Sequence, residues 1–536
     1  MKLKKQYKGL FFVVIFGGGL LFWATAASMP GMGPPDEEPQ MTITGTPADN
    51  FPDEERPRFC GSGNAKSTDF VTEYSIPTEC TNPLAIVADY DGNVWFAQTN
   101  TGKLAKFDPN TETFTEYDNP TWPKNGRSMM WGIDYAPDGT VWFTDETYDS
   151  VWAFNTIDEK YDRLPFPSTD DSLPQRLQVD GSQIIINDFT GNKLSFLDPN
   201  MSTDEAGHYL NIPSPVPESV TADFAIDAND NVWFTNWLFQ QGGALVKFNY
   251  NGYYDAYTKV QQEFPLLDFV DVYSLPMDIL TPNGLVFTDD GKLWLADTTS
   301  SSVFSFDPVT EEFAQYVTAD PLLSTYGNQT GVVKTPISRP YWIDSDEQGR
   351  IIFNEQNANN ISVFDPKSNS LVEYHVPSKN PYWGDCDPGT GMMLADCGLA
   401  QIFDFAVDGE KIWFTQWVEN NIGVVDTSVP LPAKINLESE NISLSLGTSE
   451  HLNFVISSQS NETLGGSLVL ESSHDFLTVE LSHDSPDSFQ LIPGASQPIH
   501  TNISTSYDAL PGTYNVLIGM QSSDIAISKY VTVTIE

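Results

Sequence analysis

The residues best suited to chemistry recur at one position of a repeated phrase. Each copy contains an apolar strand, mostly of the Trp-Phe type, and a polar or acidic side chain follows it: Gln98, Asp145, Asp188, Asn236, Asp297, Glu355 and Gln416. Carboxylate and amide oxygens are the ligands that Ca²⁺ and Mg²⁺ prefer. A cation held by them could polarise a lactone carbonyl. The pattern fits equally well a metal-free rim of solvated or amide-paired side chains.

A second set of residues precedes each of these strands. The innermost strand of every copy carries, in chain order, Leu84, Trp131, Gln175, Ala222, Asn283, Tyr341 and Phe403. Because the two strands are antiparallel, the start of the first lies beside the end of the second, and both sets should meet at one opening, the mouth. The aromatic members could stack on a sugar or cyclic ligand, or they could fill the throat, the part of the central channel just inside the mouth.

These two sets supply the candidate site residues. The candidates for binding a ligand are Trp131, Gln175, Asn236, Tyr341, Phe403, Gln98 and Gln416. The candidates for holding Ca²⁺ or Mg²⁺ are Asn283, Asp297, Glu355, Asp145 and Asp188. If the chain is an enzyme, Glu355, Asp297 and Tyr341 are the candidates for catalysis.

The repeat that must position these residues predicts an all-β fold. Its core strand recurs seven times at intervals of 43 to 61 residues, at Trp95, Trp142, Ile185, Trp233, Trp294, Ile352 and Trp413. About four short alternating strands per copy, separated by Gly, Asp, Asn and Pro turns, indicate a seven-bladed β-propeller. The repeated tryptophans are interpreted as packing between blades.

The outer strands predict how the ring closes. They are expected at 70–74, 114–117, 161–164, 208–212, 253–257, 313–316 and 371–374. The first precedes the first inner strand, and none follows the last copy. The strand at 70–74 should therefore pair with the strand at 423–426 and close the ring, which leaves few free sheet edges.

Composition divides the rest of the chain. Residues 1–27, four lysines followed by an apolar run, are expected to be an export signal or an uncleaved membrane anchor. Residues 28–67 are rich in proline and acid and are predicted to be a linker, with too little apolar surface to fold as far as about residue 59. The propeller covers 68–430, and alternating runs in 431–536 predict a small immunoglobulin-like β-sandwich.

Charge and cysteine content limit the partners. With 73 acidic and 26 basic residues, the net charge of -47 argues against nucleic acid and against membrane contact other than through the N-terminal segment. The four cysteines allow three pairings, and proximity favours Cys60 with Cys80 and Cys386 with Cys397. The propeller histidines, His208 and His375, fall on outer strands, away from the mouth.

Several phrases resemble the streptogramin B lyase (virginiamycin B lyase) family over about residues 68–428. They are Asp91-Gly92-Asn93-Val94-Trp95-Phe96, Val141-Trp142-Phe143-Thr144-Asp145 and Ile412-Trp413-Phe414-Thr415-Gln416 with Asn421-Ile422-Gly423. The resemblance implies a seven-bladed propeller and metal-assisted opening of a lactone by elimination. Family members carry histidine in the Pro-His phrases of the last two blades, where this chain has Tyr341 and Phe403, while Glu355 matches one carboxylate position.

One blade resembles a different family. Thr281-Pro282-Asn283-Gly284-Leu285, followed by Asp290-Gly291-Lys292-Leu293-Trp294-Leu295-Ala296-Asp297, is similar to gluconolactonase and regucalcin propellers. That resemblance implies a divalent cation held by asparagine and acidic side chains at the mouth.

Three functions follow as expectations. The first is an exported, extracytoplasmic propeller that binds a small molecule, a carbohydrate or an envelope protein at its mouth without covalent chemistry. The second is a divalent-metal lactonase or lyase acting on a cyclic ester or carbohydrate, and the third is a structural envelope component. The histidine substitutions favour the first.

Overall fold

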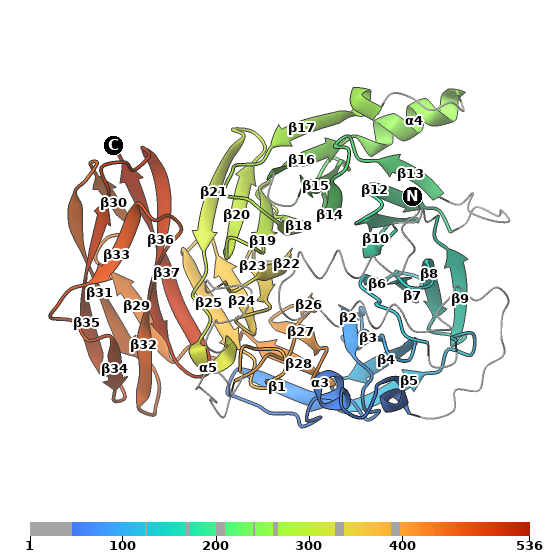
Figure 1. Ribbon diagram of the computed structural model, residues 1–536, viewed down its shortest axis with the longest axis horizontal. Coiled ribbons are helices and arrows are strands. Elements are labelled where there is room, and N and C mark those ends of the chain that lie inside the picture. The colour runs from blue at the N-terminus through green and yellow to red at the C-terminus, as the bar shows by residue number, and fades with distance from the viewer. Residues whose placement is uncertain are drawn as a thin grey trace.

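The computed structural model describes residues 46–123, 126–167, 172–199, 209–238, 242–260, 266–326, 337–386 and 397–536. The predicted signal or anchor at 1–27, the first part of the predicted linker and His208 lie outside the described residues. The regular secondary structure of the described residues consists mostly of β-strands (Figure 1). None of its helices is long and apolar enough to cross a bilayer.

Within the described residues, twenty-eight strands form the first part of the fold. The first fourteen are β1 (Val71–Ser75), β2 (Pro83–Ala88), β3 (Val94–Gln98), β4 (Lys103–Asp108), β5 (Thr113–Tyr117), β6 (Ile133–Tyr135), β7 (Thr140–Asp145), β8 (Ser150–Asn155), β9 (Lys160–Pro165), β10 (Pro174–Asp180), β11 (Gln183–Asp188), β12 (Lys193–Leu197), β13 (Tyr209–Pro213) and β14 (Val220–Ile226). The others are β15 (Val232–Leu238), β16 (Gly242–Phe248), β17 (Val270–Ser274), β18 (Pro282–Phe287), β19 (Leu293–Asp297), β20 (Ser302–Asp307), β21 (Glu312–Val317), β22 (Pro340–Ser345), β23 (Ile351–Glu355), β24 (Asn360–Asp365), β25 (Ser370–His375), β26 (Phe405–Asp408), β27 (Lys411–Gln416) and β28 (Asn421–Asp426).

These strands hydrogen-bond in antiparallel groups of four: β2–β5, β6–β9, β10–β13, β14–β17, β18–β21, β22–β25, and β26–β28 with β1. The groups stand around a common centre, with the first strand of each nearest the middle (Figure 1). The predicted pairing of the first outer strand with the last group is confirmed, because β1 pairs with β28 from Val71 opposite Val425 to Ser75 opposite Asn421.

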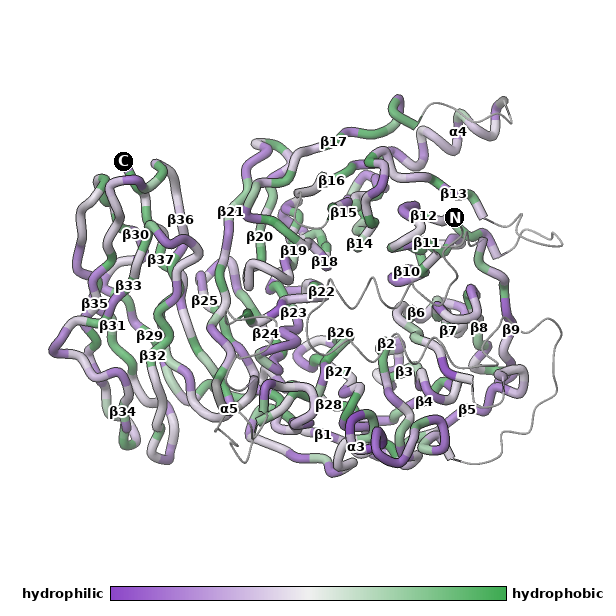
Figure 2. Tube along the Cα trace, in the orientation of Figure 1, coloured by the Kyte–Doolittle hydropathy of each residue, from purple (hydrophilic) through white to green (hydrophobic). Residues whose placement is uncertain are grey.

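The local sequence explains the sheets. Apolar residues are concentrated along the strands, as Figure 2 shows for β19 and β20. The turn between the first two strands of several groups needs a left-handed residue, which Gly92 and Gly291 supply with φ of 78° and 82°. Trp95, Trp142, Trp233, Trp294 and Trp413 are buried, as expected for packing residues.

One predicted outer strand is wrong. Residues 253–257 lie in helix α4 (Tyr250–Val260), and the outer strand of that group is β17, which follows η4 (Leu266–Phe269). The spacing of Tyr250, Tyr253, Tyr254 and Tyr257 puts these rings on one helical face. Tyr250 stacks on Phe196 with ring centroids 4.2 Å apart, so tertiary packing favours the helix.

Residues 433–536 form a separate set of strands: β29 (Ala433–Leu437), β30 (Asn441–Leu444), β31 (Ser449–Ser458), β32 (Leu464–Ser472), β33 (Leu477–Leu481), β34 (Ser488–Leu491), β35 (Ser496–Thr505), β36 (Gly512–Gln521) and β37 (Ile525–Ile535). One sheet has the order β29-β31-β35-β33, and the other contains β37-β36-β32-β34 with β30 beside β37. Buried residues of both sheets, such as Ile456 and Val531, share one apolar core.

This C-terminal region is joined to the first part of the fold by a continuous sheet. Strand β37 pairs with β25 from Ile525 opposite Tyr374 to Lys529 opposite Ser370. The buried Tyr530 hydroxyl donates to the carbonyl oxygen of Val317 at 2.8 Å. The C-terminal region therefore extends the β22–β25 sheet and also contacts the end of β21.

Tyr530→Phe should lower the free energy of unfolding by about 1–2 kcal/mol, because it removes one buried hydrogen bond and leaves the Val317 carbonyl without that donor. Chemical denaturation measures the change. Tyr507→Phe is the matched control, since Tyr507 is 86% exposed, and it should change stability by less than about 0.5 kcal/mol. Equal effects of the two substitutions would show that Tyr530 does not hold the C-terminal region in place.

Candidate functional site

The strand registers place both predicted residue sets at one end of the ring. The innermost strand begins opposite the end of its neighbour in five groups, at Pro83–Gln98, Pro174–Asp188, Thr221–Asn236, Pro282–Asp297 and Pro340–Glu355. In each pair the second-named residue belongs to the second set. The first-named residue directly precedes a member of the first set in the sequence, so the two sets lie side by side. This end is the mouth.

Four members of the first set come together in an apolar cluster, called here the mouth cluster. Its buried members are Phe51, Phe59, Leu84, Met129, Trp131, Leu173, Phe189, Ala222, Trp237, Trp383, Leu399, Phe403, Trp417 and Val418. The Phe403 ring contacts Trp131 and Trp417 edge-on, with centroids 5.5 and 5.6 Å away. The mouth aromatics thus pack on one another in the throat.

Two further members of the first set also meet across the ring. The Gln175 amide nitrogen donates to the Tyr341 hydroxyl at 3.1 Å, which links β10 to β22. Asn283 is buried, and its amide donates to the Thr298 hydroxyl at 2.5 Å.

The aspartates of the second set are directed into their own sheets. Asp145 accepts hydrogen bonds from Ser128, from the Tyr148 amide and from the Trp152 indole. Asp188 accepts from the Leu173 and Gly191 amides, and Asp297 accepts from those of Leu280, Thr281 and Ser300. Burial raises the pKa of Asp145 and of Asp297 to about 6 in each case. These carboxylates hold turns together.

The longer side chains of the second set also bond within the ring wall. Gln98 donates to Glu116 at 2.9 Å, and Gln416 donates to Glu73 at 2.6 Å. Glu355 occupies the corresponding place opposite Glu373, and it accepts a bond from the Ser362 hydroxyl at 2.5 Å. Burial, together with the neighbouring Glu355 carboxyl, raises the pKa of Glu373 well above its usual value.

Asn236 completes the second set. Its amide donates to the Thr221 hydroxyl at 2.9 Å and to the carbonyl oxygen of Val220 at 3.2 Å. It is fully buried between β14 and β15 and has no exposed surface toward the mouth.

The five metal-ligand candidates do not fit a shared cation. Asn283, Asp297, Glu355, Asp145 and Asp188 belong to four different sheets, and their oxygens or amides face hydrogen-bond partners close to their own strands. Within the described ranges, no three His, Cys, Asp or Glu side chains gather around a point that could hold a metal ion.

Residues 46–60, called here the cap segment, lie at the rim of the ring beside β1 and β28 and pack against the mouth cluster through Phe51 and Phe59 (Figure 1). They were expected to be part of an unfolded linker, and that expectation is wrong for this stretch: it contains η2 (Pro47–Asn50) and α3 (Arg56–Cys60). Phe51 and Phe59, 5% and 6% exposed, belong to the mouth cluster. Two aromatic anchors therefore order a segment that is otherwise largely hydrophilic around α3 (Figure 2).

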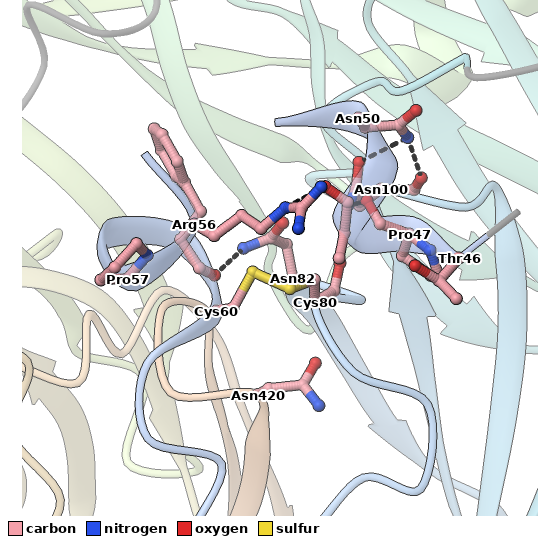
Figure 3. Close-up of a disulfide and its surroundings, with 12 residues drawn as sticks. Thr46, Pro47, Asn50, Arg56, Pro57, Cys60, Cys80, Asn82, Asn100 and Asn420 are labelled. Carbon is pink, nitrogen blue, oxygen red and sulfur yellow. Dashed lines mark hydrogen bonds between the residues drawn. A yellow bond between two sulfur atoms is a disulfide. The ribbon is translucent and has the colours of Figure 1, made fainter. Parts of the chain in front are cut away.

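The structure contains both favoured disulfides. Cys60 bonds to Cys80 and fastens the end of the cap segment to the loop after β1 (Figure 3). Cys386 bonds to Cys397, and the residues between these two lie outside the described part of the chain. Trp383, which precedes this second bridge, belongs to the mouth cluster.

Below the mouth lies a charged level that the sequence analysis missed. The Arg176 guanidinium lies 3.6 Å from Asp223 and 3.4 Å from Asp404, and it stacks over the Trp342 ring at 4.7 Å. Asp134 and Asp344 also interact electrostatically with Arg176. One arginine from β10 thus neutralises part of the charge of aspartates from several sheets.

The aspartates of this level keep protons more readily than usual. Burial raises the pKa of Asp404 to about 7 and that of Asp223 to about 6, although Arg176 opposes both shifts. Their remaining oxygens accept from the next sheets: Asp404 from the Ile86 amide at 3.0 Å, and Asp223 from the Leu285 amide at 2.9 Å. This level therefore joins sheets around the centre.

Aligning the repeats more fully could have revealed this level. Arg176, Asp223 and Asp404 each follow a first-set residue directly, at the repeat position that carries Ala85 in the first copy and Gly284 in the fifth. A single arginine at an inner-strand position shared with two aspartates is the signal for it.

The comparisons with known proteins agree with this architecture. Residues 61–306 match the virginiamycin B lyase family. The solved structure of selenomethionine-substituted virginiamycin B lyase from Staphylococcus aureus is 18% identical over 68% of this chain and 99% of its own, with a TM-score of 0.50. The fold is therefore a β-propeller, and the expected resemblance to that family is confirmed.

Two more structures are similar. A catalytically inactive virginiamycin B lyase from Staphylococcus aureus, determined with quinupristin, gives the same 18% identity, TM-score of 0.50 and coverage of 68% and 99%. A putative gluconolactonase is 13% identical over 57% of this chain and 90% of its own, with a TM-score of 0.35. No curated protein sequence matches the chain.

Arg176→Gln should lower the free energy of unfolding by about 3–5 kcal/mol at pH 8, because it leaves buried carboxylates without their cation. The loss should be smaller at pH 5, where Asp223 and Asp404 are largely protonated. Denaturant unfolding at both pH values measures it, with Lys434→Gln on the exposed surface as the control. A loss of equal size at pH 5 and pH 8 would contradict the role assigned to Arg176.

Asp404→Asn should flatten the dependence of stability on pH. The pKa of Asp404 is raised to about 7, so the folded state holds this proton more tightly than the unfolded state. The contribution is present below the ordinary aspartate pKa and is lost as pH rises through about 7. Unfolding free energies at pH 5 and pH 8 should differ by roughly 2 kcal/mol less in the variant than in the wild type. An unchanged difference would argue against a protonated Asp404.

Proposed function

We propose that this chain is an exported cell-surface propeller that binds a ligand or partner at its mouth without elimination chemistry. The proposed architecture is a seven-bladed propeller, one blade for each four-stranded group, followed by an immunoglobulin-like sandwich. The proposed partners are a small molecule, a carbohydrate or an envelope protein. The resemblance to virginiamycin B lyases supports the framework, and the contents of the mouth support the absence of lyase chemistry.

One observation carries the proposal: the two positions that hold histidine in the lyases contain side chains that are buried and cannot act as imidazole bases. Phe403, 7% exposed, has no proton to exchange and packs between Trp131 and Trp417. Tyr341, 3% exposed, accepts a bond from Gln175, and burial raises the pKa of its phenol. A phenol with a raised pKa stays protonated at neutral pH and is a poor general base.

The other acid–base candidates also face away from this chemistry. Glu355 is bonded inside the β22–β25 sheet, where burial raises its pKa. His375 lies on the outer strand β25, and burial lowers the pKa of its imidazole to about 4.

Export is supported by two features of the chain. Its first residues have the order of a signal or anchor, and its cysteines form two disulfides, which persist in oxidising compartments. The strongly acidic composition supports a partner that is neither nucleic acid nor an anionic lipid surface.

Incubation with quinupristin tests the absence of lyase activity. Elimination opens the ring without changing the mass, so reversed-phase chromatography is the suitable readout. We expect no new peak with this chain in the presence of Mg²⁺, while the Staphylococcus aureus lyase, run in parallel, converts the compound. Appearance of the linear product would overturn the proposal. Loss of that product in the Glu355→Gln variant would show that the activity belongs to this chain and not to a contaminant.

A further inference from the structure

The surroundings of the cap segment resemble a binding site with its ligand in place. Figure 3 shows Asn82, Asn100 and the Cys60–Cys80 disulfide gathered around residues of this segment. The side chains that contact it come from several loops of the propeller, distant from one another in the sequence.

Most of the polar contacts are made to main-chain carbonyl oxygens of the cap segment, while the Asn50 side-chain amide donates to the carbonyl oxygen of Asn100 at 3.0 Å and to its Oδ1 at 2.8 Å. Asn82 donates to Phe59 at 2.7 Å, and Asn100 donates to Pro47 at 2.8 Å. Asn380 donates to the carbonyl oxygens of Pro57 and Arg58 at 3.1 Å each, and the Trp383 indole donates to that of Arg58 at 2.7 Å. Contacts of this kind recognise a peptide backbone and are indifferent to the side chains it carries.

Two aromatic side chains of the cap segment supply the apolar contacts. Phe51 and Phe59 stack with ring centroids 4.6 Å apart. Phe59 meets Trp417 and Trp383 edge-on at 5.8 and 6.0 Å, and the Arg127 guanidinium lies over Phe51 at 4.7 Å. Aromatic anchors in a desolvated pocket typically carry most of the binding energy of an interface.

The propeller holds its donors in place independently of the cap segment. Asn82 also donates to the carbonyl oxygen of Trp417 at 2.9 Å, Asn380 to that of Val418 at 3.1 Å, and Asn100 to that of Cys80 at 2.6 Å. All three asparagines are nearly fully buried. Donors that are preorganised and buried in this way would lose hydrogen bonds if the mouth were emptied, so the site favours an occupant.

We propose that the mouth is a peptide-binding site and that the cap segment is its intramolecular occupant. A partner segment fits the same site if it presents two aromatic side chains and main-chain carbonyls to the same donors. This inference rests on the proposed function and names the class of ligand for the same mouth. The Cys60–Cys80 disulfide keeps the internal occupant at a high effective concentration, so an outside peptide competes only when the cap segment is weakened.

A competition experiment with the full chain tests this inference. The probe is a fluorescein-labelled peptide of residues 46–60 with serine in place of Cys60. The receptor is the double variant Phe51→Ala/Phe59→Ala, with both disulfides intact. Fluorescence anisotropy should detect saturable binding to this variant and at least tenfold weaker binding to the wild type, whose mouth is occupied.

Two controls distinguish specific recognition of the peptide from non-specific binding. The same peptide with alanine at both phenylalanine positions should bind the double variant at least tenfold more weakly. Adding Asn380→Asp to the double variant removes the amide donor and should weaken binding of the original peptide by about tenfold. Circular dichroism establishes that each variant is folded, and the single variant Phe51→Ala replaces the double one if it is not.

A folded variant that fails to bind the peptide, or that binds the alanine peptide equally well, would overturn the inference. So would equal binding to the wild type. None of these binding results bears on whether the chain opens the ring of quinupristin, so the proposed absence of lyase activity would be unaffected by them. Conversely, turnover of quinupristin would refute the proposed function without changing the peptide result.

Discussion

Strand β1 hydrogen-bonds to β28 along the ring's closing edge, and this pairing joins the two ends of the propeller region. Because ten residues separate the cap segment from β1 and Cys80 follows β1, the pairing of β1 also constrains where the chain's first described residues lie. They return to the mouth, where the Cys60–Cys80 disulfide and the aromatic pair Phe51 and Phe59 hold them. The filled mouth is thus a consequence of how the ring is closed.

Side chains from different sheets of this propeller meet near its axis at two levels. At the mouth, aromatic rings pack against the cap segment. Below them, Arg176 bridges aspartates of different sheets, and burial raises the pKa values of Asp223 and Asp404. Both levels link the sheets across the axis, and among the described residues no three His, Cys, Asp or Glu side chains gather where they could hold a metal ion.

Much of the fold could be predicted from the sequence because its signals are local and repeated. The Trp-Phe strands, the Asp-Gly turns and the absence of a last outer strand predicted the sheets and their closure. The sequence from Tyr253 to Tyr257 fits an alternating strand as well as a helix, and only the helical spacing of the tyrosines and their tertiary packing favour α4. The composition of the cap segment indicates a linker, because its two anchors, Phe51 and Phe59, lie among prolines and acidic residues and only their long-range partners order them.

The candidate site was predicted in part. Because neighbouring strands are antiparallel, the sequence predicts that residues of the first set lie together at one end of the ring. Trp131 and Phe403 do meet there. The directions of Asp145, Asp188 and Asp297 did not follow, because their partners are backbone amides of turns whose conformation the residue types do not specify. The Asn82 and Asn380 donors were equally hidden, since their role depends on a segment brought close by the closure of the ring.

The occupied mouth is tested most directly by hydrogen–deuterium exchange on the full chain, followed by proteolysis and mass spectrometry of residues 46–60. The account predicts that the amides of Phe51, Arg56 and Arg58, which are hydrogen-bonded within the cap segment, exchange at least about a hundredfold more slowly than in the isolated peptide. Exchange at the rate of the isolated peptide would contradict it, because the cap segment would then not be held in the mouth.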